Sequence, residues 1–227
     1  LKKQCVDAPV EILPLQVKYP QGAEKQLIFA ATGREVPSGG LPMDVGVAVH
    51  NVSTAAAVTD AVMLGRPLIE RVCTVTGPAI KEPKNLRIRI GMPLSHLVEV
   101  CGGLVEEPGK IILGGPMMGF TQVGFNVPVI RGSSGLLLLR EEDVANSPEG
   151  PCIRCARCVQ ACPMNLMPTT IAAYARRDLV VETEEYCAMD CIECGSCSYV
   201  CPACIPLVQS IRHGKAAVLA KKRNALL

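Results

Sequence analysis

A cysteine pattern that occurs twice constrains this 227-residue chain more than any other feature. Each copy reads Cys-x2-Cys-x2-Cys-x3-Cys-Pro, and the copies occupy residues 152–163 and 191–202. This spacing is typical of paired [4Fe–4S] clusters, because the two-residue gaps let one loop wrap three thiolates around a cluster while the fourth cysteine reaches the other cluster. One cluster is predicted to be held by Cys152, Cys155, Cys158 and Cys201, and the other by Cys191, Cys194, Cys197 and Cys162.

Structural zinc is the competing interpretation, since zinc also binds at sites of four cysteines. Such zinc sites usually have two separated Cys-x2-Cys pairs, whereas here three ligands are consecutive and proline follows the fourth. The pattern therefore favours clusters. The other five cysteines are expected to be small buried apolar residues. They are Cys5, Cys73, Cys101, Cys187 and Cys204.

Composition excludes some functions and limits others. Aromatic residues make up 3% of the chain, tryptophan is absent and the net charge is +2, which argues against a nucleic-acid binder. Eight of the 13 cysteines lie in the two ligand runs, which points to a reducing or anaerobic compartment, and the odd count argues against full disulfide pairing. The longest uncharged stretch, residues 111–130, is interrupted by glycine and proline and cannot span a bilayer. Because the chain begins at Leu1 without an initiator methionine, we expect a piece of a longer protein.

Hydrophobic periodicity and turn residues predict an α+β fold. Strands surrounding one short helix indicate a compact unit over residues 72–140, and an acidic, turn-rich stretch separates it from the cysteine region. Strands are expected at residues 7–18, 45–49, 69–76, 86–90, 110–113, 127–130 and 136–139. Helices are expected at residues 21–31, 53–64, 93–101, 169–177 and 207–220.

No catalytic group stands out beyond the cysteines. His50, His96 and His213 are far apart and lack metal-ligand spacing, so they are interpreted as ordinary surface or core residues. The run Gly114–Gly119 lacks the order of a nucleotide-binding loop and is interpreted as a tight turn between strands. The turn before the helix at 53–64 could present backbone N–H groups to a phosphate, but an ordinary connection is the simpler interpretation.

Six further motifs occur along the chain. They are YPQGAEKQLI (19–28), GREVPSGGLP (33–42), VHNV (49–52), GMPL (91–94), CGG (101–103) and ILGGPMMG (112–119). Together with both cysteine runs, these motifs resemble the RnfC family, the C subunits of the Rnf ion-translocating electron transport complex. The resemblance covers nearly the whole chain.

The resemblance implies three domains. Residues 1–71 would be the C-terminal part of an NADH/FMN-binding domain similar to that of respiratory flavin subunits, and the Gly-rich flavin loop would precede them. Residues 72–140 would be a β-grasp, soluble-ligand-binding domain, and residues 141–227 an α-helical two-cluster ferredoxin domain. The flavin-site motifs Tyr-x-x-Gly-Glu-Glu and Asn-Asn-Val are matched in part, with Ala23 and His50 as departures. The matching residues are Tyr19, Gly22, Glu24 and Asn51.

The resemblance also implies a function and partners. Such a subunit would pass electrons between NAD(H), FMN and ferredoxin through two [4Fe–4S] clusters, coupled to Na+ or H+ movement in other Rnf subunits. It would be peripheral, at the cytoplasmic face of the cell membrane. A cobalamin reductase of microcompartments, which has a similar domain order, and a non-catalytic scaffold subunit are the alternatives.

Overall fold

The structure is a computed structural model that describes residues 10–144 and 147–224. Residue contacts divide the chain into two compact units. One unit contains residues 50–157 and 193–208, and the other contains residues 1–49, 158–192 and 209–227. The cysteine region thus contributes to both units.

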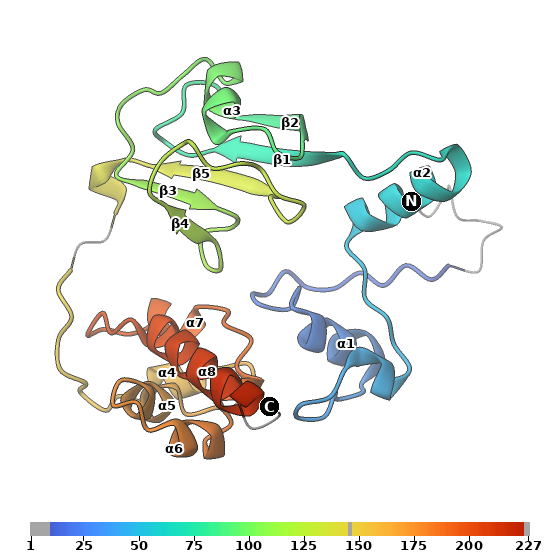
Figure 1. Cartoon of the computed structure of the whole chain (residues 1–227). Coiled ribbons are helices and arrows are strands. Elements are labelled where there is room, and N and C mark those ends of the chain that lie inside the picture. Colours follow the sequence, from blue (N-terminus) through green and yellow to red (C-terminus); the bar gives the residue numbers. More distant parts are fainter. Residues whose placement is uncertain (1–9, 145–146, 225–227) are drawn as a thin grey trace. The chain divides into compact units, whose positions relative to one another are not determined.

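A five-stranded mixed sheet forms most of the first of these units (Figure 1). The strands lie in the order β2-β1-β5-β3-β4, and β1 and β5 are parallel while the other neighbours are antiparallel. The register pairs Val75 with Leu136 between β1 and β5, and Ile112 with Leu137 between β3 and β5. The strands are β1 (Glu70–Thr76), β2 (Lys84–Arg89), β3 (Lys110–Leu113), β4 (Phe120–Gln122) and β5 (Gly135–Leu139).

One helix, α3 (Leu94–Val100), packs on the sheet and completes its core. Leu94 and Leu97 of this helix are fully buried, as are Val75 of β1 and Leu136 and Leu138 of β5. Alternate residues of each strand enter the core, because successive side chains of a strand point to opposite faces of the sheet. The expected α+β unit with one short helix is confirmed.

Three of the expected strands are wrong. Residues 10–18 form neither strand nor helix, and residues 7–9 of that prediction lie outside the described residues. In the segment 45–49, Val45 is the last residue of a 3-10 helix, Pro42–Val45. Gly46 then adopts a left-handed φ of 69°, which turns the chain away from an extended path. Residues 127–130 make only an isolated bridge between Pro93 and Pro128, because proline has no N–H for a ladder.

The remaining elements are helical. The segments predicted as helices at 21–31, 53–64, 169–177 and 207–220 are helical, with ends shifted by a few residues. They are α1 (Glu24–Thr32), α2 (Val52–Leu64), α5 (Pro168–Ala175) and α8 (Leu207–Asn224). The structure adds α4 (Arg157–Gln160), α6 (Val180–Glu185), α7 (Ser196–Tyr199) and the 3-10 helices Glu141–Asp143 and Ala188–Asp190. None of the helices in the described ranges is both long and apolar enough to cross a membrane.

Close packing joins α8 to α5 and α6. Gly214 of α8 lies so near Ala175 and Thr183 that an added Cβ atom would come within 2.7 Å of Ala175 Cβ and 2.8 Å of Thr183 Cγ2. At the end of α8, Lys221 and Lys222 lie 3.3 and 3.0 Å from the Glu184 carboxylate. These lysines hold the pKa of Glu184 below its usual value. The basic end of α8 is therefore anchored to α6.

Candidate iron–sulfur centre

The two cysteine runs share an unusual backbone path. In each run the residue before the second cysteine and the residue after it have positive φ, at 55° and 58° for Arg154 and Ala156. The equivalent residues, Glu193 and Gly195, have φ values of 57° and 83°. A backbone that alternates in handedness turns successive N–H groups toward one concave side, an arrangement that suits anionic iron–sulfur sites. The sequences differ, but the conformation is the same.

The similarity continues past the fourth cysteine. The residue three positions after Cys162 and the one three positions after Cys201 both have positive φ, at 54° for Asn165 and 51° for Cys204. Each donates its N–H to the carbonyl of the fourth cysteine, over 3.2 Å. A helix follows in both cases, α5 after the first run and α8 after the second. The cysteine region is thus a structural duplication of loop, short helix, turn and helix.

The two runs differ in exposure and charge. Among the first three cysteines of each run, the first run has two exposed and one buried, and the second run has one half-buried and two buried. In order they are Cys152, Cys155 and Cys158, and Cys191, Cys194 and Cys197. At equivalent backbone positions the first run has a cation and the second an anion, namely Arg154 and Glu193. The second run is therefore the more enclosed and the more negatively charged of the two.

The N-terminal segment forms hydrogen bonds next to two ligands of the second predicted cluster, the one assigned to the second run and Cys162. Gln26 of α1 donates from Nε2 to the carbonyl of Pro163, 3.0 Å away, immediately after Cys162. Ser38 donates its hydroxyl to the Asp190 carboxylate, 2.6 Å away, immediately before Cys191. Because Cys162 and Cys191 are predicted ligands of the same cluster, the segment with the flavin-type motifs adjoins that cluster's ligand loops.

A turn of the five-stranded sheet contacts the second cysteine run. Gly114–Gly119 forms the tight turn between β3 and β4, as predicted. A Cβ atom added to Gly195 would lie 2.8 Å from the carbonyl oxygen of Met117 and 3.5 Å from its Cε. Only glycine combines this close backbone approach with a φ of 83° without strain. The sequence showed no sign of this contact, because it joins segments far apart in the chain.

The cysteines outside the two runs divide into two groups. Cys73 and Cys101 are fully buried, as predicted, and Cys5 lies outside the described residues. Burial raises the pKa of the Cys73 thiol to about 11 and also raises the pKa of Cys101, so these thiols stay protonated. The prediction for Cys187 and Cys204 is wrong. Both are exposed, because each occupies a left-handed turn position.

The chemistry of the donor set fits iron–sulfur clusters. The two runs supply eight soft thiolates, the number that two cubanes need, on loops that share their left-handed positions. No group of three or more His, Cys, Asp or Glu side chains within residues 10–144 and 147–224 is arranged to hold a metal ion. The assignment of individual cysteines to the clusters stays a prediction.

The residues predicted for the flavin site lie in and just before the first turn of α1 and at the N-cap of α2. Glu24 begins α1, and Tyr19 and Gly22 lie in the turn before it, all three exposed. Asn51 caps α2, and its side-chain oxygen accepts a hydrogen bond from Ser53 N over 2.9 Å. Two of the histidines have carboxylate neighbours, since His96 lies 3.4 Å from Glu99 and His213 lies 2.9 Å from Asp178.

Family models match three successive segments of the chain. Residues 1–60 match the Nuo51 FMN-binding domain, residues 72–121 the SLBB domain, and residues 145–215 the 4Fe-4S dicluster domain. These matches define an iron–sulfur protein that combines an FMN-binding segment, an SLBB domain of the β-grasp type and a two-cluster module. They confirm the predicted fold class and the predicted pair of [4Fe–4S] clusters.

Several curated proteins are similar to nearly the whole chain. The chain is 53% identical to the C subunit of the proton-translocating ferredoxin:NAD(+) oxidoreductase complex of Clostridium ljungdahlii, over 95% of this chain and 48% of that protein. It is 51% identical to the Na(+)-translocating counterpart of Acetobacterium woodii, over 96% and 49%. It is 45% identical to the C subunit of the ion-translocating oxidoreductase complex of Rhodobacter capsulatus, over 91% and 39%. Over nearly its whole length the chain is similar to these C subunits, which bears out the predicted resemblance to the RnfC family. It spans about half the length or less of these relatives.

Proposed function

We propose that this chain is the electron-relay part of a C subunit of an Rnf-type ferredoxin:NAD oxidoreductase. The observation that carries the proposal is the duplicated cysteine run with its repeated left-handed turns at Arg154, Ala156, Glu193 and Gly195. The proposed domains are residues 1–71, 72–140 and 141–227. The proposed ligand sets are Cys152, Cys155, Cys158 and Cys201 for one cluster and Cys191, Cys194, Cys197 and Cys162 for the other.

The contacts suggest an order for the electron path. In the full-length protein FMN would exchange electrons with NAD(H) at a site that includes Tyr19, Gly22, Glu24 and Asn51. Gln26 and Ser38 tie that segment to the loops of Cys162 and Cys191, so the second cluster would be the nearer to the flavin. The exposed first run would then exchange electrons with ferredoxin or another subunit of the complex. Ion movement would take place in membrane subunits, with this subunit at the cytoplasmic face.

The test is electron transfer by the full-length protein, purified without oxygen and loaded with iron, sulfide and flavin. We expect NADH to reduce both clusters and the reduced protein to exchange electrons with ferredoxin. Reduction of cob(III)alamin with no exchange with ferredoxin would instead favour a cobalamin reductase. A third outcome concerns a variant in which residues 92–139 are deleted. If that variant transfers electrons normally but no longer assembles into the complex, the β-grasp unit has a scaffold role.

Exchanging charges between the two runs tests whether the two clusters differ in reduction potential. Cluster potentials depend on nearby charge and exposure, so the run with Arg154 is expected to hold the cluster of higher potential. Arg154→Glu should lower that potential and Glu193→Arg should raise the other, each by on the order of tens of millivolts. Redox titration followed by EPR measures both values. Arg177→Glu, an exposed site beyond α5, serves as the control, and equal shifts in all three variants would contradict the assignment.

A further inference from the structure

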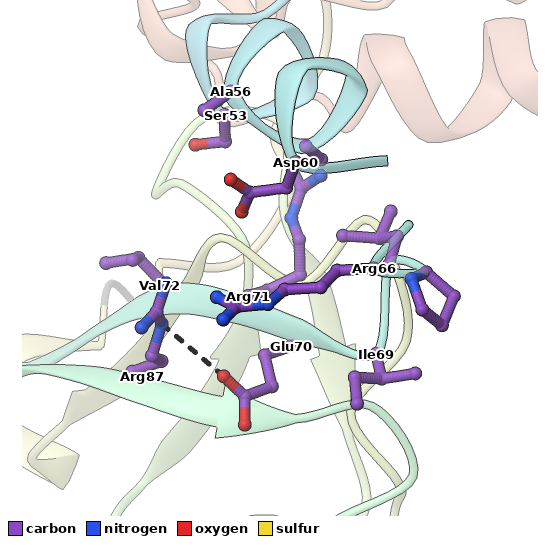
Figure 2. Close-up of a pocket in the computed structure, with 12 residues that line it drawn as sticks. Ser53, Ala56, Asp60, Arg66, Ile69, Glu70, Arg71, Val72 and Arg87 are labelled. Carbon is purple, nitrogen blue, oxygen red and sulfur yellow. Dashed lines mark ion pairs between the residues drawn. The ribbon is translucent and has the colours of Figure 1, made fainter. Parts of the chain in front are cut away.

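A charged cavity lies beside the first strand of the sheet, outside the cysteine region. It has a volume of about 380 Å³, is open to solvent, and is lined by α2, the segment that follows it, and the outer ends of β1 and β2 (Figure 2). Its charged lining residues are Asp60 of α2, Arg66 of the connecting segment, Glu70 and Arg71 of β1, and Arg87 of β2. The volume is within the range of small-molecule sites.

The arginines of this cavity differ in their partners. Glu70 lies 3.4 Å from Arg87, as the dashed line in Figure 2 shows, and 3.9 Å from Arg89 on the same strand. Its single negative charge is thus shared between two guanidinium groups. Neither Arg66 nor Arg71 forms an ion pair with any residue of the described ranges, although Asp60 also lines the cavity.

Arg71 is the least satisfied of these groups. Its Nε is buried and has no hydrogen-bond partner, and it is the only buried side-chain nitrogen or oxygen of the described residues in that state. A buried donor of a charged group without a partner is costly, commonly by about 1–3 kcal/mol or more. A ligand that accepts hydrogen bonds from Arg71 would remove that cost.

We infer that this cavity binds the phosphate group of a small molecule through Arg66 and Arg71. Two guanidinium groups without carboxylate partners match a phosphate monoester, which carries about −1.5 to −2 charges at pH 7. The planar fork of arginine binds phosphate oxygens through two parallel hydrogen bonds. A ligand with a single carboxylate group would neutralise the positive charge of only one of the two guanidinium groups.

The rest of the lining suits the organic part of such a ligand. Ala56 and Ala57 of α2 and Leu68 of the connecting segment supply an apolar wall. Ser53 and Asp60 supply a hydroxyl group and a carboxylate that can bind ligand hydroxyls. Arg66 and Arg71, which carry the inference, lie within the proposed flavin-type domain of residues 1–71. They lie outside residues 1–60, which match the FMN-binding domain, and outside both cysteine runs.

The test measures pyrophosphate and inorganic phosphate binding to the full-length, cluster-loaded protein by calorimetry and ³¹P NMR. The double variant Arg66→Gln/Arg71→Gln should weaken one phosphate site by about tenfold or more, as expected for losing hydrogen bonds to charged groups. Arg71→Lys keeps the positive charge but loses the planar guanidinium fork. Its phosphate affinity should lie between the affinities of the double variant and the wild type. Arg89→Gln is the matched control, because it removes a β2 arginine that pairs with Glu70 without lining the cavity.

Three outcomes would overturn the inference. The first is the same phosphate affinity in the wild type and the double variant, and the second is an equal loss in Arg89→Gln, which would indicate general electrostatic attraction. The third is loss of flavin together with phosphate binding in the double variant, which would mean that the flavin site itself had been disturbed. Unchanged flavin and cluster absorption in the double variant, with reduced phosphate binding, supports a separate site.

Discussion

Replacing Cys155 with serine is expected to halve the iron and sulfide content, from about eight to about four of each per chain. A cubane needs four thiolates, and Cys155 is the predicted ligand that lies between the two left-handed residues Arg154 and Ala156. Cys204→Ser is the matched control, because Cys204 is exposed at a left-handed turn equivalent to Asn165 and should leave the content unchanged. Iron and acid-labile sulfide analysis of the full-length protein, prepared without oxygen, measures both.

The fourth cysteines test the crossed assignment. Cys201→Ser should remove the same EPR signal as Cys155→Ser, and Cys162→Ser should remove the signal that Cys194→Ser removes. An uncrossed pairing would give the opposite grouping. Zinc in place of iron, or no labile sulfide in the unaltered protein, would contradict the cluster assignment altogether.

The cysteine spacing identified the cofactor but could not show the backbone that holds it. Positive φ at Gly195 is ordinary, whereas Ala156 occupies the equivalent left-handed position without being glycine. Alanine normally avoids that region, so its residue type predicts the wrong conformation. The exposure of Cys187 and Cys204 was missed for the same reason, since cysteine was interpreted by its usual burial and not by its place in a turn.

Local sequence patterns predicted strands in which buried and exposed side chains alternate. They did not predict elements that depend on pairing with distant parts of the chain. Ile88 is buried between the exposed Arg87 and Arg89, so β2 could be recognised from its own residues. The short strand β4 has no buried residue and exists because it pairs with β3. The cavity arginines could not be grouped from the sequence, since Arg66 and Arg71 meet residues of α2 and β2 only after the chain folds.

Gly77→Ala is expected to destabilise the β-grasp unit by about 3 kcal/mol or more. Gly77 has a φ of 122°, a conformation that alanine resists, and an added Cβ would overlap the carbonyl oxygen of Leu138 and come within 2.8 Å of its N and C atoms. These are backbone atoms of β5, so relief requires the parallel pairing of β1 and β5 to shift. A loss of about 3 kcal/mol raises the population of the open unit by about 100-fold.

Alkylation of Cys73 and Cys101 measures that opening without relying on the clusters. Both thiols are fully buried, and burial raises the pKa of each, so they react when the unit opens and exposes them. Their modification rate, followed by mass spectrometry, should rise by about 100-fold in Gly77→Ala. Gly115→Ala, where an added Cβ meets nothing within 4 Å, should leave the rate unchanged. Equal rates in the two variants would mean that the β1–β5 pairing tolerates the extra atom, and the close packing at Leu138 would not limit stability.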